Sequence, residues 1–102
     1  MTRQMIEITF GNALRQAKQL EDCAEDMRRV AKSGMTGIKN DLASAWKGDS
    51  SSAYLAKMED TAGNICETAK KLDQIAATLR KVAKIFRETE LNALELLNTK
   101  NL

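Results

Sequence analysis

The chain has 102 residues, enough for one small domain, and its apolar residues (43%) are mostly aliphatic because aromatic residues account for only 4%. This composition is typical of helices packed through Ala and Leu and excludes an aromatic-rich β-sandwich. The 16 basic and 14 acidic residues give a net charge of +2, so charge alone does not favour nucleic-acid binding. His is absent, which removes the commonest metal ligand and general base. We therefore expect no enzyme, no metal and no cofactor.

The sequence predicts neither a membrane span nor a cleavable N-terminal signal peptide. No apolar run approaches the ~20 residues needed to span a bilayer. The N-terminus places Arg3, Gln4 and Glu7 where a cleavable signal peptide has its apolar stretch. We expect no transmembrane segment, and either a cytoplasmic protein or one exported without a cleavable signal.

The first helix is expected over about residues 9–42. Residues 1–8 include the β-branched Ile6 and Ile8 and are predicted to be extended or frayed, with Thr9 as the N-cap. From Phe10, apolar and small residues recur at alternating spacings of three and four, which indicates a heptad seam. The seam positions are Phe10, Ala13, Ala17, Leu20, Ala24, Met27, Ala31, Gly34 and Ile38.

Two glycines interrupt the end of this helix. Gly34 and Gly37 each cost ~1 kcal/mol relative to Ala in a helix interior. They indicate either a local bend or a close approach between helices, since Gly34 lies on the seam. The sequence favours neither.

Residues 43–49 are expected to form the turn, and residues 50–97 the second helix. Asp49 or Ser50 is the predicted N-cap, and the chain is expected to fray from about Asn98. Gly48 suits a tight turn because it adopts positive φ at little cost. The second seam follows Met58, Ala62, Ile65, Ala69, Leu72, Ala76, Leu79, Ala83 and Phe86, and then Glu90, Ala93 and Leu97.

The predicted fold is all-α: residues 1–102 form one helical hairpin of two long antiparallel helices. Small seam residues allow close approach of the helices and leave larger apolar side chains on an outer flank. The simplest way to cover that flank is an antiparallel four-helix-bundle dimer. The expected hairpin and dimer core consists of Leu14, Leu20, Met27, Val30, Ile38, Leu42, Ile65, Leu72, Ile75, Leu79 and Val82.

The two cysteines are isolated and lack the spacing of a metal site. If the hairpin turns near residue 47, Cys23 and Cys66 lie ~7 Å out of step along the axis, which a disulfide tolerates poorly. We interpret both as small apolar helix residues in preference to a bridged pair.

The turn segment from Leu42 to Tyr54, with Trp46 and Gly48 at its centre, resembles the WXG-motif family of small early-secreted-antigen-like proteins. The length, the central motif and the two-helix pattern agree, so the resemblance covers nearly the whole chain. That family has a second signature near the C-terminus, usually Tyr-x-x-x-Asp/Glu. Here Phe86 stands in place of the Tyr, four residues before Glu90, and Ala93 and Leu97 complete a longer apolar and acidic pattern.

The resemblance implies a protein secreted by the type VII machinery, synthesised and dimerised in the cytoplasm. Its expected partners are a second copy or a related WXG-type chain, and the type VII secretion ATPase. In an antiparallel dimer, Trp46 of one subunit and the strip Phe86, Glu90, Ala93 and Leu97 of the other would form a composite export signal. The alternative is a dedicated targeting partner that pairs with the N-terminal helical domain of a larger secreted toxin.

Simpler interpretations of these residues stand beside the functional ones. Trp46 can plug the end of the hairpin, and Phe86 can be an ordinary core residue. Glu90 is less easily explained, because an acid on the seam is unexpected unless the seam is uncovered there. A basic cluster on the second helix is interpreted as a solvated face; it comprises Arg80, Lys81, Lys84 and Arg87.

Overall fold

The computed structural model describes residues 1–45 and 48–100, which form two helices, α1 (Arg3–Ala45) and α2 (Asp49–Lys100). The prediction of an all-α helical hairpin is confirmed. Trp46, the centre of the turn motif, lies outside the described residues. The first helix is longer than expected at its C-terminal end: α1 includes residues 43–45, which the sequence analysis assigned to the turn.

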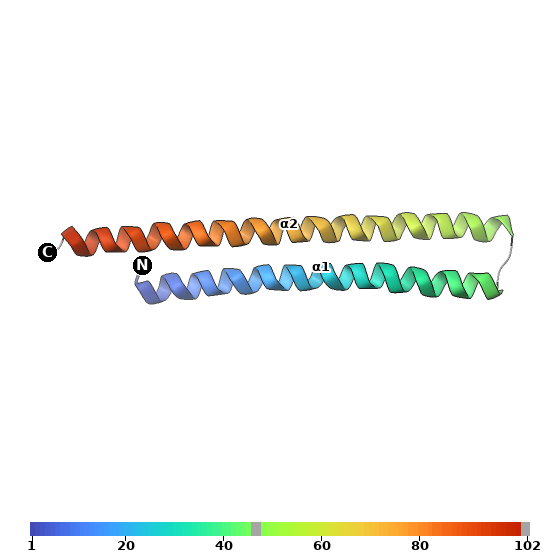
Figure 1. Cartoon of the computed structure of the whole chain (residues 1–102), viewed down its shortest axis with the longest axis horizontal. Helices are drawn as coiled ribbons and strands as arrows, with labels where there is room; N and C mark the ends of the chain where they lie inside the picture. The colour runs from blue at the N-terminus through green and yellow to red at the C-terminus, as the bar shows by residue number, and fades with distance from the viewer. Residues whose placement is uncertain (46–47, 101–102) are drawn as a thin grey trace. The chain divides into compact units, whose positions relative to one another are not determined.

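The contacts between the helices divide the chain into two units. Unit 1 combines residues 1–21 with residues 74–102, and unit 2 comprises residues 22–73. In each unit a segment of α1 lies against a segment of α2 that runs in the opposite direction (Figure 1).

The buried centre of each unit is made almost entirely of alanine. The side chains with at most 5% exposure on the two seams are Ala17, Ala24, Ala31, Ala69, Ala76 and Ala83. Successive members on each helix are seven residues apart, as a heptad seam requires. Alanine allows the helix axes to approach closely, but each contact removes little apolar area from water.

The first turn of α1 differs from the sequence prediction. The helix begins at Arg3 instead of Thr9, because Thr2 acts as its cap: the Thr2 Oγ1 accepts a hydrogen bond from the Met5 amide at 3.2 Å. Ile6 is completely buried. Its burial against the seam outweighs the weak helix propensity of a β-branched residue.

The cap of α2 is also displaced from its predicted position. The Gly48 carbonyl accepts hydrogen bonds from the Ser52 amide at 3.3 Å and from the Ser51 hydroxyl at 2.7 Å, so Gly48 is the N-cap in place of Asp49 or Ser50. Gly48 has a φ of 129°, a conformation that other residues adopt only with strain. The glycine of the turn motif is therefore required by the backbone.

The C-terminal part of α2 rotates away from the predicted seam. Leu91 and Leu94 are half-buried, whereas Ala93 and Leu97 are exposed, and α2 continues to Lys100 instead of fraying from Asn98. A straight helix drifts by ~20° per heptad relative to an exact seven-residue repeat. After several heptads this drift brings Leu94, eleven residues after Ala83, onto the buried side.

Ion pairs between the helices lie along one edge of unit 1. The Arg80 guanidinium donates two hydrogen bonds to the Glu21 carboxylate, at 2.6 and 3.3 Å, and Arg87 Nε donates to Glu7 Oε1 at 2.8 Å. The bond to Glu21 raises the pKa of Arg80 above its ordinary value. Arg80 and Arg87 are therefore paired, contrary to the prediction of a purely solvated basic face.

Unit 2 also has ion pairs between its helices, but the helix that carries the basic residues and the helix that carries the acidic residues are exchanged. Here the bases are on α1 and the acids on α2: Arg28 pairs with Asp73, and Lys39 Nζ lies 3.0 Å from Glu59 Oε1. In unit 1 the acids are on α1. Sliding one helix past the other by half its length would place like charges together, so this pattern selects one register.

The backbone of Gly48 generates the first prediction. Replacing Gly48 with Ala should lower the free energy of unfolding by about 1 kcal/mol or more, because a Cβ strains the positive-φ conformation. Gly63→Ala is the matched control: Gly63 is helical and open, and this change should raise stability by ~1 kcal/mol. Thermal unfolding followed by circular dichroism at one chain concentration measures both. Equal effects of the two substitutions would contradict the assigned role of Gly48.

The second prediction concerns the ion-paired edge. Arg80→Glu should lower the melting temperature, because it places a second carboxylate against Glu21. The double variant Glu21→Arg, Arg80→Glu should recover most of the loss, and salt of about 1 M should reduce the difference between the single and double variants. If the double variant melts no higher than the single one, the contact does not stabilise the hairpin.

Candidate functional site

The edge opposite the ion pairs is apolar in unit 1. A helix turns by about 100° per residue, so Arg80 lies on one side of Ala76, and Ile75 and Leu79 lie on the other. Ile75 and Val82 are 54% and 55% exposed, and Leu79 between them is half-buried. We call Ile75, Leu79 and Val82 the ridge. It carries no charged side chain and has no cover within the described part of the chain.

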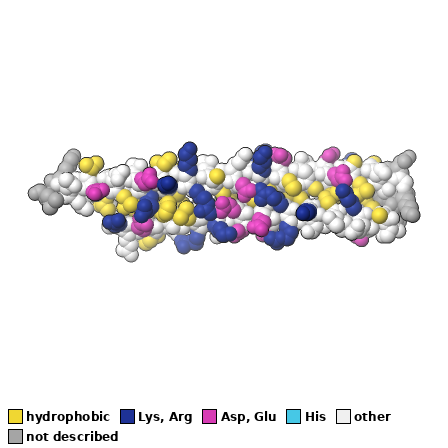
Figure 2. Space-filling model, viewed as in Figure 1, with side chains coloured by type: hydrophobic (Ala, Val, Ile, Leu, Met, Phe, Trp, Pro, Cys, Tyr) yellow, Lys and Arg dark blue, Asp and Glu magenta, His cyan; other side chains and the backbone are white. Residues whose placement is uncertain are grey.

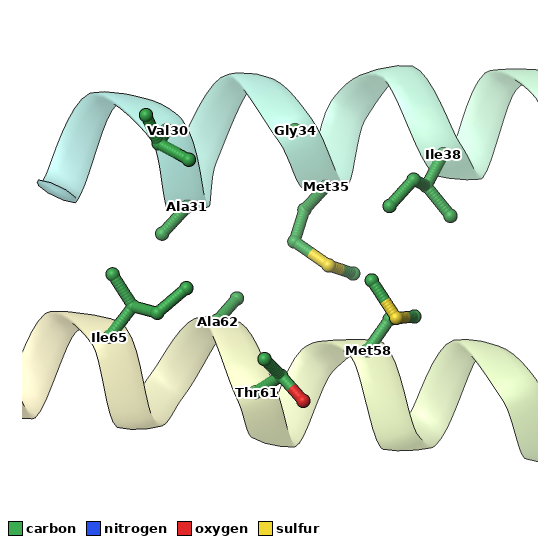
Figure 3. A pocket seen from close by; sticks show the side chains of 9 residues that line it. All are labelled: Val30, Ala31, Gly34, Met35, Ile38, Met58, Thr61, Ala62 and Ile65. Atoms are coloured by element: carbon green, nitrogen blue, oxygen red, sulfur yellow. The ribbon is translucent and has the colours of Figure 1, made fainter.

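Unit 2 has a hollow on its apolar edge in place of a ridge. The depression has a volume of about 170 Å³. Figure 3 shows that the two helices contribute side chains from both sides, with Met35 between Ala31 and Ile38 and directed toward Met58, and that Gly34 contributes no side chain. The hollow is lined by Val30, Ala31, Gly34, Met35, Ile38, Met58, Thr61, Ala62 and Ile65, none of them charged.

Gly34 does not serve a close contact within the hairpin. A Cβ placed on Gly34 or on Gly37 would meet no other atom within 4 Å. Of the two interpretations of these glycines, close approach of α1 and α2 is therefore wrong, and α1 runs through both positions as one helix.

The expected core residues fall into two groups. Three of them, Val30, Ile75 and Val82, are more than half exposed and so do not belong to the core of the hairpin itself. Alanines take their place on the seam because only small side chains fit between the closely spaced helices. The remaining eight are half-buried and flank the seam: Leu14, Leu20, Met27, Ile38, Leu42, Ile65, Leu72 and Leu79.

The four residues of the expected C-terminal strip lie on one side of α2 within unit 1. Phe86 and Glu90 are half-buried, and Ala93 and Leu97 are exposed. Their spacings of four, three and four residues keep them on a common side, which is continuous with the ridge. The strip is thus reachable by another protein at its C-terminal end.

Sequence reasoning missed the interhelical contacts of the opposite edge. Besides the ion pair with Glu7, the Arg87 guanidinium lies 5.4 Å from the centre of the Phe10 ring, a cation–π contact. Charged residues that flank the seam on both helices were visible in the sequence. Their pairing could be found only once the register between the helices was known.

The described residues offer little for chemistry. They contain no group of three or more His, Cys, Asp or Glu residues that could hold a metal ion. Cys23 and Cys66 are free and exposed. Within residues 1–45 and 48–100, neither helix has a stretch long and apolar enough to cross a membrane. On the face seen in Figure 2, acidic and basic side chains are intermingled with apolar ones.

Comparisons with known proteins agree with this geometry. A family model described as proteins of 100 residues with WXG matches residues 5–91, which include the seam positions from Phe10 to Glu90 and the turn. Searches of curated proteins and of solved structures find no match. The matched family consists of small helical-hairpin proteins associated with type VII secretion. With most of its length matched and its two helices arranged as a hairpin, the chain belongs to the WXG100 family.

Proposed function

We propose that this protein pairs with a second copy through its apolar edge and leaves the cell as a dimer through the type VII machinery. It then acts as a secreted substrate by protein–protein interaction. The observation that carries the proposal is the uneven pair of edges: one is closed by interhelical ion pairs, and the other exposes aliphatic side chains to water.

The exposed surface area supports a partner of substantial size. The chain exposes 7643 Å², whereas a compact monomer of 11.3 kDa exposes about 5,700 Å². The excess of roughly 1,900 Å² per chain exceeds the ~800 Å² per partner of a standard interface and falls in the range of obligate homodimers. Two further helices from a partner would cover part of the surface that the two helices of one chain leave exposed.

A composite export signal fits the same assembly. Trp46 of one subunit and the strip of the other would be read together by the secretion ATPase, so dimerisation would precede export. The exposure of Ala93 and Leu97 supports this, because a docking strip must be accessible in the folded protein.

A dedicated targeting partner for a larger toxin is the competing function. In that case the toxin's helices, and not a second copy, would cover the apolar edge. The two functions differ in the behaviour of the purified chain: a self-pairing protein is a folded dimer alone, and a targeting partner is monomeric or poorly folded until its mate is added.

The pairing prediction uses two isoleucines with equal exposure, one on each helix. Ile75→Ala should weaken dimerisation by about 2 kcal/mol, or roughly 30-fold, because each dimer loses two buried side chains. Ile8, which is 54% exposed and lies on the side of α1 opposite the seam residue Ala17, provides the control Ile8→Ala. Sedimentation equilibrium measures both constants. Comparable effects of the two variants would show that the apolar edge is not the interface.

The export prediction uses two adjacent leucines. Leu97→Ala should reduce the amount of protein in the medium, whereas Leu96→Ala should not, because only Leu97 shares the side of α2 that holds the strip. Leu97 and Leu96 are 59% and 61% exposed, so any loss of export that comes merely from removing an exposed leucine should be the same in the two variants. Glu90→Ala and Glu88→Ala form a second pair of the same kind. Dimer mass and helical content should stay at the wild-type value in all four variants.

Normal export of both Leu97→Ala and Glu90→Ala would overturn the composite signal. Loss of export together with loss of the dimer would instead assign the strip to the interface. Quantitative blots of medium and cells, normalised to total expression, distinguish these results.

A further inference from the structure

The ion-paired side of unit 2 carries a second depression, which we call the groove. Its volume is about 560 Å³. All of its lining residues belong to unit 2; they are Arg28, Ala31, Lys32, Met35, Thr36, Lys39, Ala62, Gly63 and Cys66. Volumes of about 300–1,000 Å³ are typical of sites for small ligands, so the groove has room for one small molecule.

The floor of the groove is apolar. Ala31 is 5% exposed, and Met35 and Ala62 are half-buried, so these three side chains form the covered part of the lining. On the α2 side Gly63 contributes no side chain, and a Cβ built there would meet no atom within 4 Å. An alkyl chain could therefore approach the floor without displacing a side chain of α2.

The charged part of the lining is entirely basic and comes from α1. Arg28 and Lys39 are paired with Asp73 and Glu59, but neither acid lines the groove. A guanidinium has five N–H donors and an ammonium three, so one ion pair leaves each of these bases with donors to spare. The Lys32 ammonium is in no ion pair within the described part of the chain.

The spacing of the bases gathers positive charge at one end of the groove. Arg28 and Lys32 are four residues apart on α1, so their side chains are neighbours on one face of the helix and can reach the same group. Lys39 is eleven residues after Arg28, or ~16 Å along the helix axis. The groove thus combines a cationic end at Arg28 and Lys32 with an apolar floor beside it.

We propose that the groove binds a single-chain amphiphile with a terminal carboxylate. The carboxylate pairs with Lys32 and accepts a further hydrogen bond from Arg28, and the alkyl chain lies over Ala31, Met35 and Ala62. A site of this kind, apolar with a few polar groups that fix the orientation of the ligand, is typical of small-molecule binding. The proposal goes beyond pairing and export and depends on neither, because the groove lies on the ion-paired side of unit 2.

Charge complementarity selects this occupant. One carboxylate matches the one unpaired ammonium, that of Lys32, whereas a phosphate monoester would bring a charge of about −2 at neutral pH. An acidic peptide would bring several carboxylates to the same ammonium. A protein partner also buries about 800 Å² on each side of a standard interface, which is far more than a groove of this size provides.

Cys66 reports occupancy because its thiol lines the groove. The chain with Cys23→Ser is alkylated by iodoacetamide while sodium decanoate is titrated. We expect the rate at Cys66 to fall saturably, because a bound alkyl chain covers the thiol. The matched control is the chain with Cys66→Ser: its remaining thiol, Cys23, is also free and exposed but lies outside the groove, so its rate should not change. Decyltrimethylammonium, with the same alkyl chain and the opposite charge, should protect neither thiol.

The role of Lys32 is tested in the same Cys23→Ser chain. Lys32→Gln should weaken decanoate binding by about tenfold, because it removes a charge-assisted hydrogen bond. Lys32→Arg keeps the charge and should bind within about threefold of the parent chain. Lys81→Gln removes an exposed lysine of unit 1 and should leave the affinity unchanged. Helical circular dichroism of all three variants should match that of the parent chain, since none of these residues is buried.

Several outcomes would overturn the proposal. They are protection of Cys66 by decanoate and decyltrimethylammonium alike, equal slowing at Cys23 and Cys66, equal effects of Lys32→Gln and Lys81→Gln, and no saturation with decanoate. Protection of Cys66 by a capped tri-glutamate peptide but not by decanoate would assign the groove to an acidic protein segment instead. The solution mass of the chain does not enter these measurements, so the groove and the proposed dimer fail separately.

Discussion

The close packing of alanine against alanine is the constraint on which the rest of this structure depends. Ala17, Ala24 and Ala31 on α1 and Ala69, Ala76 and Ala83 on α2 fill the line where the helices meet. Such small side chains bring the helix axes together, and for that reason leave no room between them for Leu, Ile or Val. Apart from the completely buried Ile6, the larger apolar residues are displaced to the flanks, where they are half-buried or exposed. A hairpin built this way has most of its apolar area outside its own core.

The two flanks of the alanine seam differ in the side chains that they carry. On one side of each unit, arginine and lysine side chains cross the seam to carboxylates of the other helix. Individually, exposed ion pairs add little to stability. Their reversal of sign between unit 1 and unit 2 nevertheless disfavours shifted registers. On the other side of unit 1, aliphatic side chains such as Ile75 and Val82 are more than half exposed. Each unit of the hairpin therefore has one ion-paired edge and one apolar edge.

Much of the fold was predictable because it depends on local patterns. Alternating spacings of three and four gave both helices, and the central Gly48 gave the turn, which the positive φ of that residue explains. The family followed from the same residues together with the C-terminal pattern. The errors lie at the helix ends: Ile6 was assigned to an extended segment because its propensity is weak, yet it is completely buried within α1. The seam after Ala83 was extended with an exact heptad that a straight helix does not keep.

By itself the sequence determined the number of helices, their boundaries to within six residues, the glycine of the turn between them and the family to which the chain belongs. These features follow from periodicity and from the conformational freedom of single residues. Only the tertiary structure decided which residues of the apolar stripe are enclosed, that Gly34 lines a hollow, and that Arg80 and Arg87 cross to Glu21 and Glu7. Each of these depends on the separation and register of two helices, which no pattern within a single helix specifies.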